Sequence, residues 1–451
     1  MYLKKQVIWK DSAKGSMLYD TRSERKLVLN DTGTQVFLSK FVKYATDEEI
    51  ASSLHAKFNG EKYEDLLSDV KSVLNDIYSS DFVTDDCEQR GYVNLLEIDP
   101  QIDSVIFEVT SKCNLNCIHC LEGGSREIND LTTKEIFDLI DELHWMKVYR
   151  IVLTGGEPFV REDIVDIIKK CTEKNIRVTV FTNGTLITEK LLDQIKDTNV
   201  LLRFSIDGAD ALTHDEIRGE GNFDKTIGVM KLCKEKGIDI GVATTITTHN
   251  FDQYHKIVDL VTKLDAKEIE LSEIQEKGNA TTNKHLLLSQ KQMEQLRVNS
   301  LVVAAQNERL SKGMGFDRLA ELAETDGKGE HCCNAGVSVC YINAEGSAYP
   351  CMLFKDFDEF KAGNIREQSF TDIWTSSQVL ERMRELKVTD IESCVKCECF
   401  EACPGGCRAI AYAQSNRLDG PMDNNFCCTS INLVRRRDEG EFDYILKRNI
   451  S

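Results

Sequence analysis

Three closely spaced cysteines constrain this chain more than any other feature of its sequence. Cys113, Cys117 and Cys120 follow the pattern Cys-x3-Cys-x2-Cys, directly after the apolar run SVIFEVT at residues 104–110. Thiolates at this spacing can bind one soft metal centre, and three ligands would leave one iron of a 4Fe-4S cluster open to an outside ligand. Because the apolar run is typical of a buried strand, we expect the cysteines at its carboxyl end, where α/β folds place their chemistry.

Strand and helix patterns alternate along residues 101–283. The runs YRIVLTG, IRVTVFTNG, VLLRFSIDG, IDIGVATTIT and KEIELSEI predict strands, and amphipathic helical stretches lie between them. About six βα units joined by right-handed crossovers predict an α/β fold, namely a partial (β/α)6, TIM-like barrel.

The loops after these predicted strands contain residue types that bind ligands. Two adjacent glycines allow the backbone to approach a ligand closely, a glutamate can accept from an ammonium group, and a guanidinium suits a carboxylate. In chain order the candidates are Gly155, Gly156, Glu157, Pro158, Asn183, Ser205 and Arg218. Each is an ordinary loop residue by itself, but their order at successive strand ends indicates one site.

Most of the 17 cysteines lie in the C-terminal third of the chain. In a large chain, cysteines clustered at short spacings indicate metal ligands rather than a disulfide framework. They are Cys332, Cys333, Cys340, Cys351, Cys394, Cys397, Cys399, Cys403, Cys407, Cys427 and Cys428. We interpret this array as iron-sulfur ligands, with a zinc ribbon as the structural alternative.

Charge and hydropathy exclude several classes of function. The chain has 56 basic and 75 acidic residues, a net charge of -19, which argues against binding to nucleic acid or to anionic membranes. Neither a membrane-spanning apolar run nor the apolar segment of a signal peptide is present, so we expect a cytoplasmic protein.

The cysteine triplet and the loops that follow it resemble the radical S-adenosylmethionine (SAM) enzymes. The resemblance implies that Cys113, Cys117 and Cys120 hold a 4Fe-4S cluster and that SAM chelates its open iron. The reduced cluster would then cleave SAM to methionine and a 5'-deoxyadenosyl radical. It also implies that the Gly-Gly-Glu-Pro motif binds the SAM amino group, that Ser205 and Arg218 bind its carboxylate, and that His119 packs by the adenine.

The C-terminal cysteines resemble the SPASM domain of the same enzymes, which holds two auxiliary 4Fe-4S clusters. Cys394-x2-Cys397-x5-Cys403-x3-Cys407 matches its spacing, and Cys333 before Gly346-x4-Cys351 matches its first half. By resemblance the first cluster takes Cys333, Cys340, Cys351 and Cys407, and the second takes Cys394, Cys397, Cys403 and Cys427. Cys332 and Cys428 remain alternatives to their neighbours. Three clusters are expected in all.

Residues 1–88 form a separate unit, in which a predicted β-hairpin precedes three predicted helices. The order resembles a winged-helix-like domain that binds the leader of a ribosomally made peptide as an added strand. The expected organisation is this domain, a linker at 89–100, the barrel at 101–283, a helical bridge at 284–330 and the SPASM domain at 331–451.

The combination resembles maturases of ribosomally synthesised peptides, of the sactipeptide or ranthipeptide type that forms thioethers or the streptide type that joins two carbons. We expect an enzyme that installs a thioether in a leader-bearing precursor and takes electrons from a flavodoxin or ferredoxin. Formylglycine-forming sulfatase maturases are a weaker match, because their Asp base follows the cysteine that corresponds to Cys351, where this chain has Met352. A scaffold or electron-transfer protein without catalysis is the alternative from another class. The precursor, the attachment carbon, the general base and the oligomeric state stay open.

Overall fold

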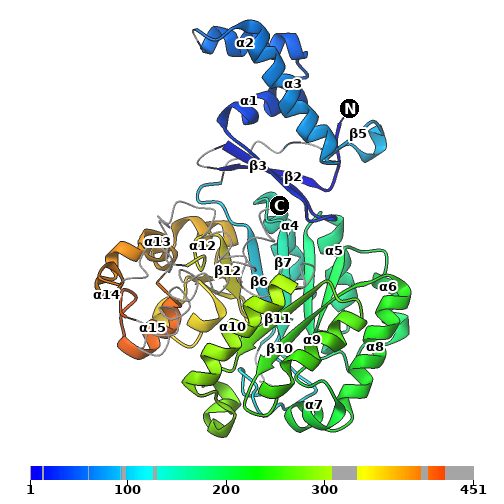
Figure 1. Ribbon diagram of the computed structural model, residues 1–451, viewed down its shortest axis with the longest axis vertical. Helices are drawn as coiled ribbons and strands as arrows, with labels where there is room; N and C mark the ends of the chain where they lie inside the picture. Colours follow the sequence, from blue (N-terminus) through cyan, green and yellow to red (C-terminus); the bar gives the residue numbers. More distant parts are fainter. Residues whose placement is uncertain are drawn as a thin grey trace.

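The computed structural model describes residues 2–12, 15–58, 60–91, 93, 98–124, 129–306, 333–397 and 405–421. Figure 1 shows a small N-terminal domain, a barrel of strands and helices, and a C-terminal region beside the barrel. The predicted ligands Cys403 and Cys427, and the alternatives Cys332 and Cys428, lie outside the described residues.

The N-terminal domain pairs a small sheet with three helices. Its antiparallel strands lie in the order β2-β3-β4, and β1 pairs with β5. A capping box at Thr46 begins α2, and Leu18, Phe37 and Val70 are buried in the domain core. The bounds are β1 (Tyr2–Leu3), β2 (Val7–Ser12), β3 (Gly15–Asp20), β4 (Lys26–Leu29), α1 (Asp31–Phe41), α2 (Asp47–Lys57), α3 (Tyr63–Ser79) and β5 (Val83–Thr84). The predicted hairpin, β3 to β4, and the three helices are confirmed.

Six parallel strands form the barrel, in the order β11-β10-β9-β8-β7-β6. Amphipathic helices follow the strands and bury their apolar faces against them, which confirms the predicted partial barrel. The strands are β6 (Ser104–Thr110), β7 (Arg150–Gly155), β8 (Arg177–Thr182), β9 (Val200–Ser205), β10 (Asp239–Ile246) and β11 (Glu268–Glu273). The helices are α4 (Thr133–Trp145), α5 (Ile164–Glu173), α6 (Glu189–Ile195), α7 (Ala211–Arg218), α8 (Asn222–Lys236) and α9 (Tyr254–Lys263).

The C-terminal region continues the barrel sheet instead of standing apart from it. Strand β12 (Val339–Ile342) pairs in parallel with β6, and β13 (Ser347–Tyr349) and β14 (Gly363–Asn364) extend the sheet antiparallel. The sheet therefore has nine strands and is mixed, and β12 covers the edge of β6 that a six-stranded barrel would leave open. The helices here are α10 (Gln290–Gln306), α12 (Phe370–Ser376), α13 (Gln378–Glu385), α14 (Glu392–Val395) and α15 (Arg408–Ser415).

The N-terminal domain docks on the amino ends of the barrel strands. The ammonium of Lys10 is buried and donates to the Ile102 carbonyl at 2.5 Å and to Asp103 at 2.8 Å, just before β6 begins. The Tyr19 ring packs on Tyr149, with the ring centroids 4.4 Å apart. In Figure 1 this domain is at the top, whereas α7, which follows the carboxyl end of β9, is at the bottom. The predicted site and the predicted leader-binding domain are thus at opposite ends of the barrel.

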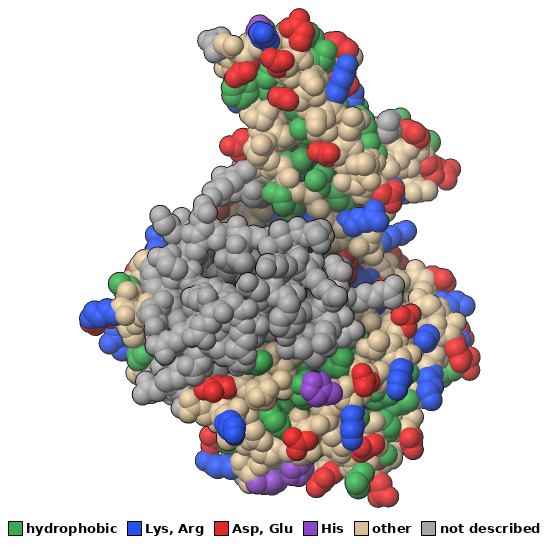
Figure 2. Space-filling view, in the orientation of Figure 1, with side chains coloured by type: hydrophobic (Ala, Val, Ile, Leu, Met, Phe, Trp, Pro, Cys, Tyr) green, Lys and Arg blue, Asp and Glu red, His purple; other side chains and the backbone are tan. Residues whose placement is uncertain are grey.

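Charged side chains of both signs lie on the visible surface of the molecule. On the face shown in Figure 2, basic side chains alternate with acidic ones over the coloured part of the surface. Among the residues that the structure describes, no helix is long and apolar enough to span a bilayer.

Candidate active site

A cavity of about 690 Å³ opens at the carboxyl ends of the barrel strands. Its wall combines residues from the barrel with residues from the C-terminal region, and its volume falls in the range of small-molecule sites. The predicted residues that line it are Cys113, Cys117, His119, Cys120, Gly155, Gly156, Glu157, Asn183, Ser205, Arg218 and Cys351. Pro158 is buried behind the wall, at the start of the short helix η2 (Pro158–Val160).

The three cysteines of the first loop provide a suitable setting for a metal cluster. Burial raises the pKa of the Cys117 thiol to about 11, although Arg218 opposes the shift from an Nη1 atom 4.0 Å from the sulfur. Burial also raises the pKa of Cys113, and the Cys120 thiol adds to this. Such thiols become thiolates when a metal supplies positive charge. Among the described residues, no group of three His, Cys, Asp or Glu side chains surrounds a position for a single metal ion.

Gly155 and Gly156 hold their loop against the cysteine loop. Gly155 has a φ of +136°, and a Cβ there would lie 2.1 Å from the Thr110 carbonyl oxygen. A Cβ on Gly156 would lie 2.2 Å from the Lys112 carbonyl oxygen. Only glycine allows this close approach, which leaves bare backbone at the cavity wall, as a cofactor cradle requires.

Glu157 holds the neighbouring loop in place. Its buried carboxylate accepts from the Asn183 backbone N–H at 2.7 Å, the Thr182 hydroxyl at 2.8 Å and the Phe159 N–H at 3.1 Å. Contact with the SAM ammonium remains a prediction. The structure adds a role that the sequence did not reveal, because these bonds fix the loop after β8.

Burial raises the pKa of Glu157 to about 7, although its hydrogen bonds oppose the shift. The native state therefore binds more protons than the unfolded chain between pH ~4.5 and ~7, and stability attributable to this group falls as pH rises through that window. We expect Glu157→Gln to remove a pH dependence of the free energy of unfolding of about 3 kcal/mol. Urea unfolding at several pH values checks this against Glu162→Gln, an exposed neighbour. If the plots of the free energy of unfolding against pH run parallel for wild type and Glu157→Gln, the assigned pKa shift is wrong.

A buried ionic group lies beside the cysteines. Asp207, with no exposed surface, accepts from Arg218 Nε at 2.5 Å and pairs with His119 Nε2 at 2.9 Å, both through Oδ2. Its Oδ1 accepts from the Thr245 backbone N–H at 2.8 Å. His119 Nδ1 is buried and has no hydrogen-bond partner among the residues that the structure describes, as expected where a bound ligand would supply the partner. Asp207 therefore orients the two side chains that the resemblance assigns to SAM.

The C-terminal cysteines gather close to this cavity. Cys333, Cys351 and Cys407 pack against one apolar cluster that includes Tyr341 and Phe354. Burial raises the pKa of Cys351 to about 12, and the Cys333 and Cys407 thiols add to the shift. Burial also raises the pKa of Cys340 to about 12, with a further contribution from Cys351. The four thiols predicted for the first auxiliary cluster are thus neighbours.

The second auxiliary site is visible in part. The Cys397 thiol raises the pKa of Cys394, secondary to burial, which places the two close together. Their predicted partners lie outside the described residues. The second cluster therefore stays a prediction.

Several residues of the cavity wall were not singled out from the sequence. Glu108, Phe181, Glu270 and Tyr341 are among them. Glu108 had a signal in the sequence, since it is the one acidic residue in the apolar run SVIFEVT. Tyr341 had none, because its contact with the barrel depends on the pairing of β12 with β6.

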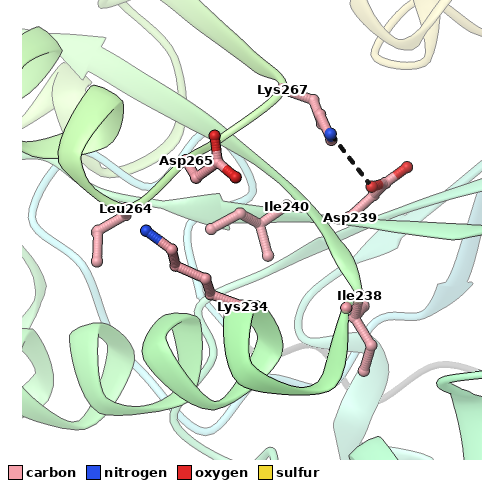
Figure 3. A pocket seen from close by; sticks show the side chains of 8 residues that line it. Lys234, Ile238, Asp239, Ile240, Leu264, Asp265 and Lys267 are labelled. Carbon is pink, nitrogen blue, oxygen red and sulfur yellow. Dashed lines mark ion pairs between the residues drawn. The ribbon is translucent and has the colours of Figure 1, made fainter.

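A second cavity, of about 130 Å³, lies at the amino ends of β10 and β11 (Figure 3). Its wall includes Lys234, Asp239, Asp265 and Lys267, and Lys267 and Asp239 face each other at 3.9 Å. It is too small for a cofactor of the size of SAM.

Comparison with known proteins identifies both the barrel and the C-terminal region of the chain. Residues 107–264 match the radical SAM superfamily, and residues 332–398 match SPASM, an iron-sulfur cluster-binding domain. The mycofactocin maturase MftC of Mycolicibacterium smegmatis is 31% identical over 320 residues, 70% of this chain and 80% of the relative. An AdoMet-dependent heme synthase of Methanosarcina barkeri is 29% identical over 332 residues, 68% of this chain and 92% of the relative. Streptococcus suis SuiB bound to precursor peptide SuiA superposes with a TM-score of 0.70 at 16% identity, over 94% of this chain and 99% of SuiB.

Proposed function

This chain belongs to the radical SAM enzymes that carry a SPASM domain, and we propose that it matures a ribosomally made peptide by installing an intramolecular thioether. The sulfur would come from a cysteine of the peptide and the carbon from another residue. The observation that carries the proposal is the shared cavity, whose wall includes the cysteine triplet of the barrel and Cys351 of the SPASM region. A peptide residue in this cavity would lie between the two cluster sites.

With SAM and a cluster bound at Cys113, Cys117 and Cys120, the site would supply a 5'-deoxyadenosyl radical for removal of a hydrogen atom from the peptide. The protein contributes the setting for this chemistry. The backbone at Gly155 and Gly156 and the guanidinium of Arg218 would hold SAM. We further propose two auxiliary clusters in the SPASM region, which would make three clusters in all. A flavodoxin or ferredoxin in the cytoplasm would supply the electrons.

The N-terminal domain is the proposed binding site for the leader. Among the described strands, β4 pairs with β3 alone, so its other edge is open to an added strand. Val28 on β4 is 72% exposed, which offers an apolar contact beside that edge. SuiB, whose fold covers 94% of this chain, is itself known bound to a precursor peptide. The position of this domain opposite the cavity requires the precursor to run along the outside of the barrel.

We expect Val28→Asp to weaken binding of a full-length precursor about tenfold, or about 1.4 kcal/mol, because a carboxylate replaces apolar contact at the edge. Binding of the core peptide without its leader should not change. Leu212→Asp is the matched control, since Leu212 is also exposed but lies on α7 of the barrel. Fluorescence anisotropy with labelled peptides measures both. Equal affinity of the wild type for the two peptides would refute the assignment of this domain.

Coexpression with candidate precursor peptides, followed by thiol alkylation and mass spectrometry, tests the reaction. Loss of two hydrogens together with one cysteine that no longer alkylates supports the thioether. The same loss with every cysteine still alkylated indicates a carbon-carbon crosslink, which is the alternative within this family. A peptide that never changes would contradict maturation of these precursors.

The formylglycine reaction receives no support from the cavity. Met352 lines the wall directly after Cys351, and a thioether side chain cannot act as the base that those enzymes have at this position. A scaffold without catalysis is also disfavoured, because the predicted SAM contacts other than Pro158 line one cavity.

A further inference from the structure

One edge of the barrel sheet lies in the wall of the active-site cavity. Strand β11 is the last strand of the sheet and, among the described strands, pairs with β10 alone. Residues 270–273 of this strand all line the cavity, and the wall continues through Ile274 and Gln275. Each other strand at the wall contributes only one or two residues. Because successive side chains of a strand point to opposite faces of its sheet, this unbroken run shows that the cavity borders the edge of β11 itself.

The backbone at this edge is oriented to accept another strand. In a parallel sheet, alternate residues direct their N–H and C=O groups to opposite neighbours. The Ile274 N–H donates to the Ile246 carbonyl of β10 at 3.1 Å, whereas Ala243 of β10 accepts from the Ile206 N–H, beside β9, at 3.0 Å. Even-numbered residues of β10 and β11 therefore bond to each other. The odd-numbered Leu271 directs its N–H and C=O to the open edge.

The wall around this edge has room for a ligand other than SAM. The residues assigned to SAM lie on the loops and helix that follow β6 to β9, so the β11 side of the cavity is left for the second substrate. Met352 and Leu353 of the SPASM region line the cavity as well. Lys277, just beyond β11, donates to the Leu353 carbonyl at 3.1 Å and pairs with Asp356 at 3.0 Å. These contacts hold the SPASM loop next to the end of β11.

We propose that the core segment of the precursor binds in extended form as an added strand on the open edge of β11. This inference rests on the proposed function and states how its substrate is held. Pairing through the backbone fixes the register of a peptide, while pockets beside the edge select among its side chains. Alternate side chains of the bound peptide point into the cavity, and the modified residue is one of them.

N-methylation of single backbone amides in the precursor tests this pairing on the wild-type enzyme. The substrate is the precursor in which the coexpression experiment detects the modification, prepared by semisynthesis with one N-methyl group at each of several successive positions around the modified residue. Amides that bond to β11 recur at every second residue. We expect methylation of those amides to lower kcat/KM for crosslinking at least about tenfold, and methylation of the amides between them to lower it less than about threefold.

Two variants of the enzyme test the same pairing from the other side. Leu271→Pro removes the N–H at the edge, and Leu271→Ala is the matched control, because it shortens the side chain but keeps the N–H. We expect kcat/KM for the precursor to be at least about tenfold lower in Leu271→Pro than in Leu271→Ala. Iron content, the dissociation constant for SAM and the midpoint of thermal unfolding show whether both variants are folded. If the proline variant does not fold, the N-methyl series on wild type decides.

A loss of kcat/KM that is equal at successive amides, or absent at all of them, would overturn the inference. Equal kcat/KM in folded Leu271→Pro and Leu271→Ala would overturn it too. If the wild-type enzyme modifies no precursor, the proposed function fails and the inference falls with it. If wild type modifies the precursor and the alternation is missing, the added strand alone is wrong.

Discussion

Replacing Cys117 with alanine will abolish SAM cleavage and remove about four of the roughly twelve irons per chain that the three proposed clusters would hold. The reason is the number of ligands. The proposed first cluster would have three protein ligands on one short loop and an open iron for SAM, so no spare thiolate could replace the lost one. Cys117 is the most buried of the three and the one nearest Arg218, so its loss also leaves that guanidinium without its thiolate neighbour.

Iron and sulfide analysis of anaerobically reconstituted protein, with chromatographic detection of 5'-deoxyadenosine, measures this effect. Cys87→Ala is the matched control, because Cys87 is exposed on the short helix η1 (Cys87–Gln89), far from the cavity. It should keep full iron content and full SAM cleavage. A Cys117→Ala protein that still releases 5'-deoxyadenosine at the wild-type rate would contradict the assigned cluster site.

Replacing Asp207 with alanine should cost about 3–5 kcal/mol of stability and most of the SAM affinity. Asp207 is fully buried and partners Arg218, His119 and the Thr245 N–H. Without it, the Arg218 guanidinium loses the carboxylate with which it is paired, and two side chains assigned to SAM lose their orientation. Urea unfolding and isothermal titration with SAM measure the two effects. Asp259→Ala, an exposed aspartate on α9, is the control.

The effect of Asp207→Ala on the free energy of unfolding should also depend on pH. Burial alone would raise the pKa of Asp207, but Arg218 and His119 lower it by more than burial raises it. The native pKa of Asp207 is therefore well below the ordinary value. The unfolded chain then binds more protons at low pH, and the stability from this group is complete above pH ~4 and lost as pH falls through the native pKa. The difference in the free energy of unfolding between wild type and Asp207→Ala should shrink as the pH falls below about 4. A difference that grows in acid would contradict the pairing.

Local patterns in the sequence were enough to predict much of the fold. Strand runs and helical periodicity predicted the six βα units, and the turn at residues 21–25 predicted the hairpin of the N-terminal domain. These elements depend on residues that are close together in the chain, so their patterns can be read directly from the sequence. The cysteine triplet and the Gly-Gly-Glu-Pro loop identified one wall of the cavity for the same reason.

Contacts between distant segments could not be predicted in this way. The pairing of β12 with β6 joins Cys340 to Val105 across more than two hundred residues, and no local periodicity encodes it. The pairing of His119 with Asp207 likewise depends on how two loops meet at the barrel mouth. Asp207 appeared to be an ordinary loop residue until its three partners were seen.

The most direct test of the central claim is one anaerobic reaction of the reduced enzyme with SAM and a full-length precursor deuterated at the modified residue. We expect deuterium to move into 5'-deoxyadenosine and the same peptide to lose two hydrogens, with about one crosslink per 5'-deoxyadenosine. An enzyme with full iron content that releases unlabelled 5'-deoxyadenosine and leaves the peptide unchanged would contradict it.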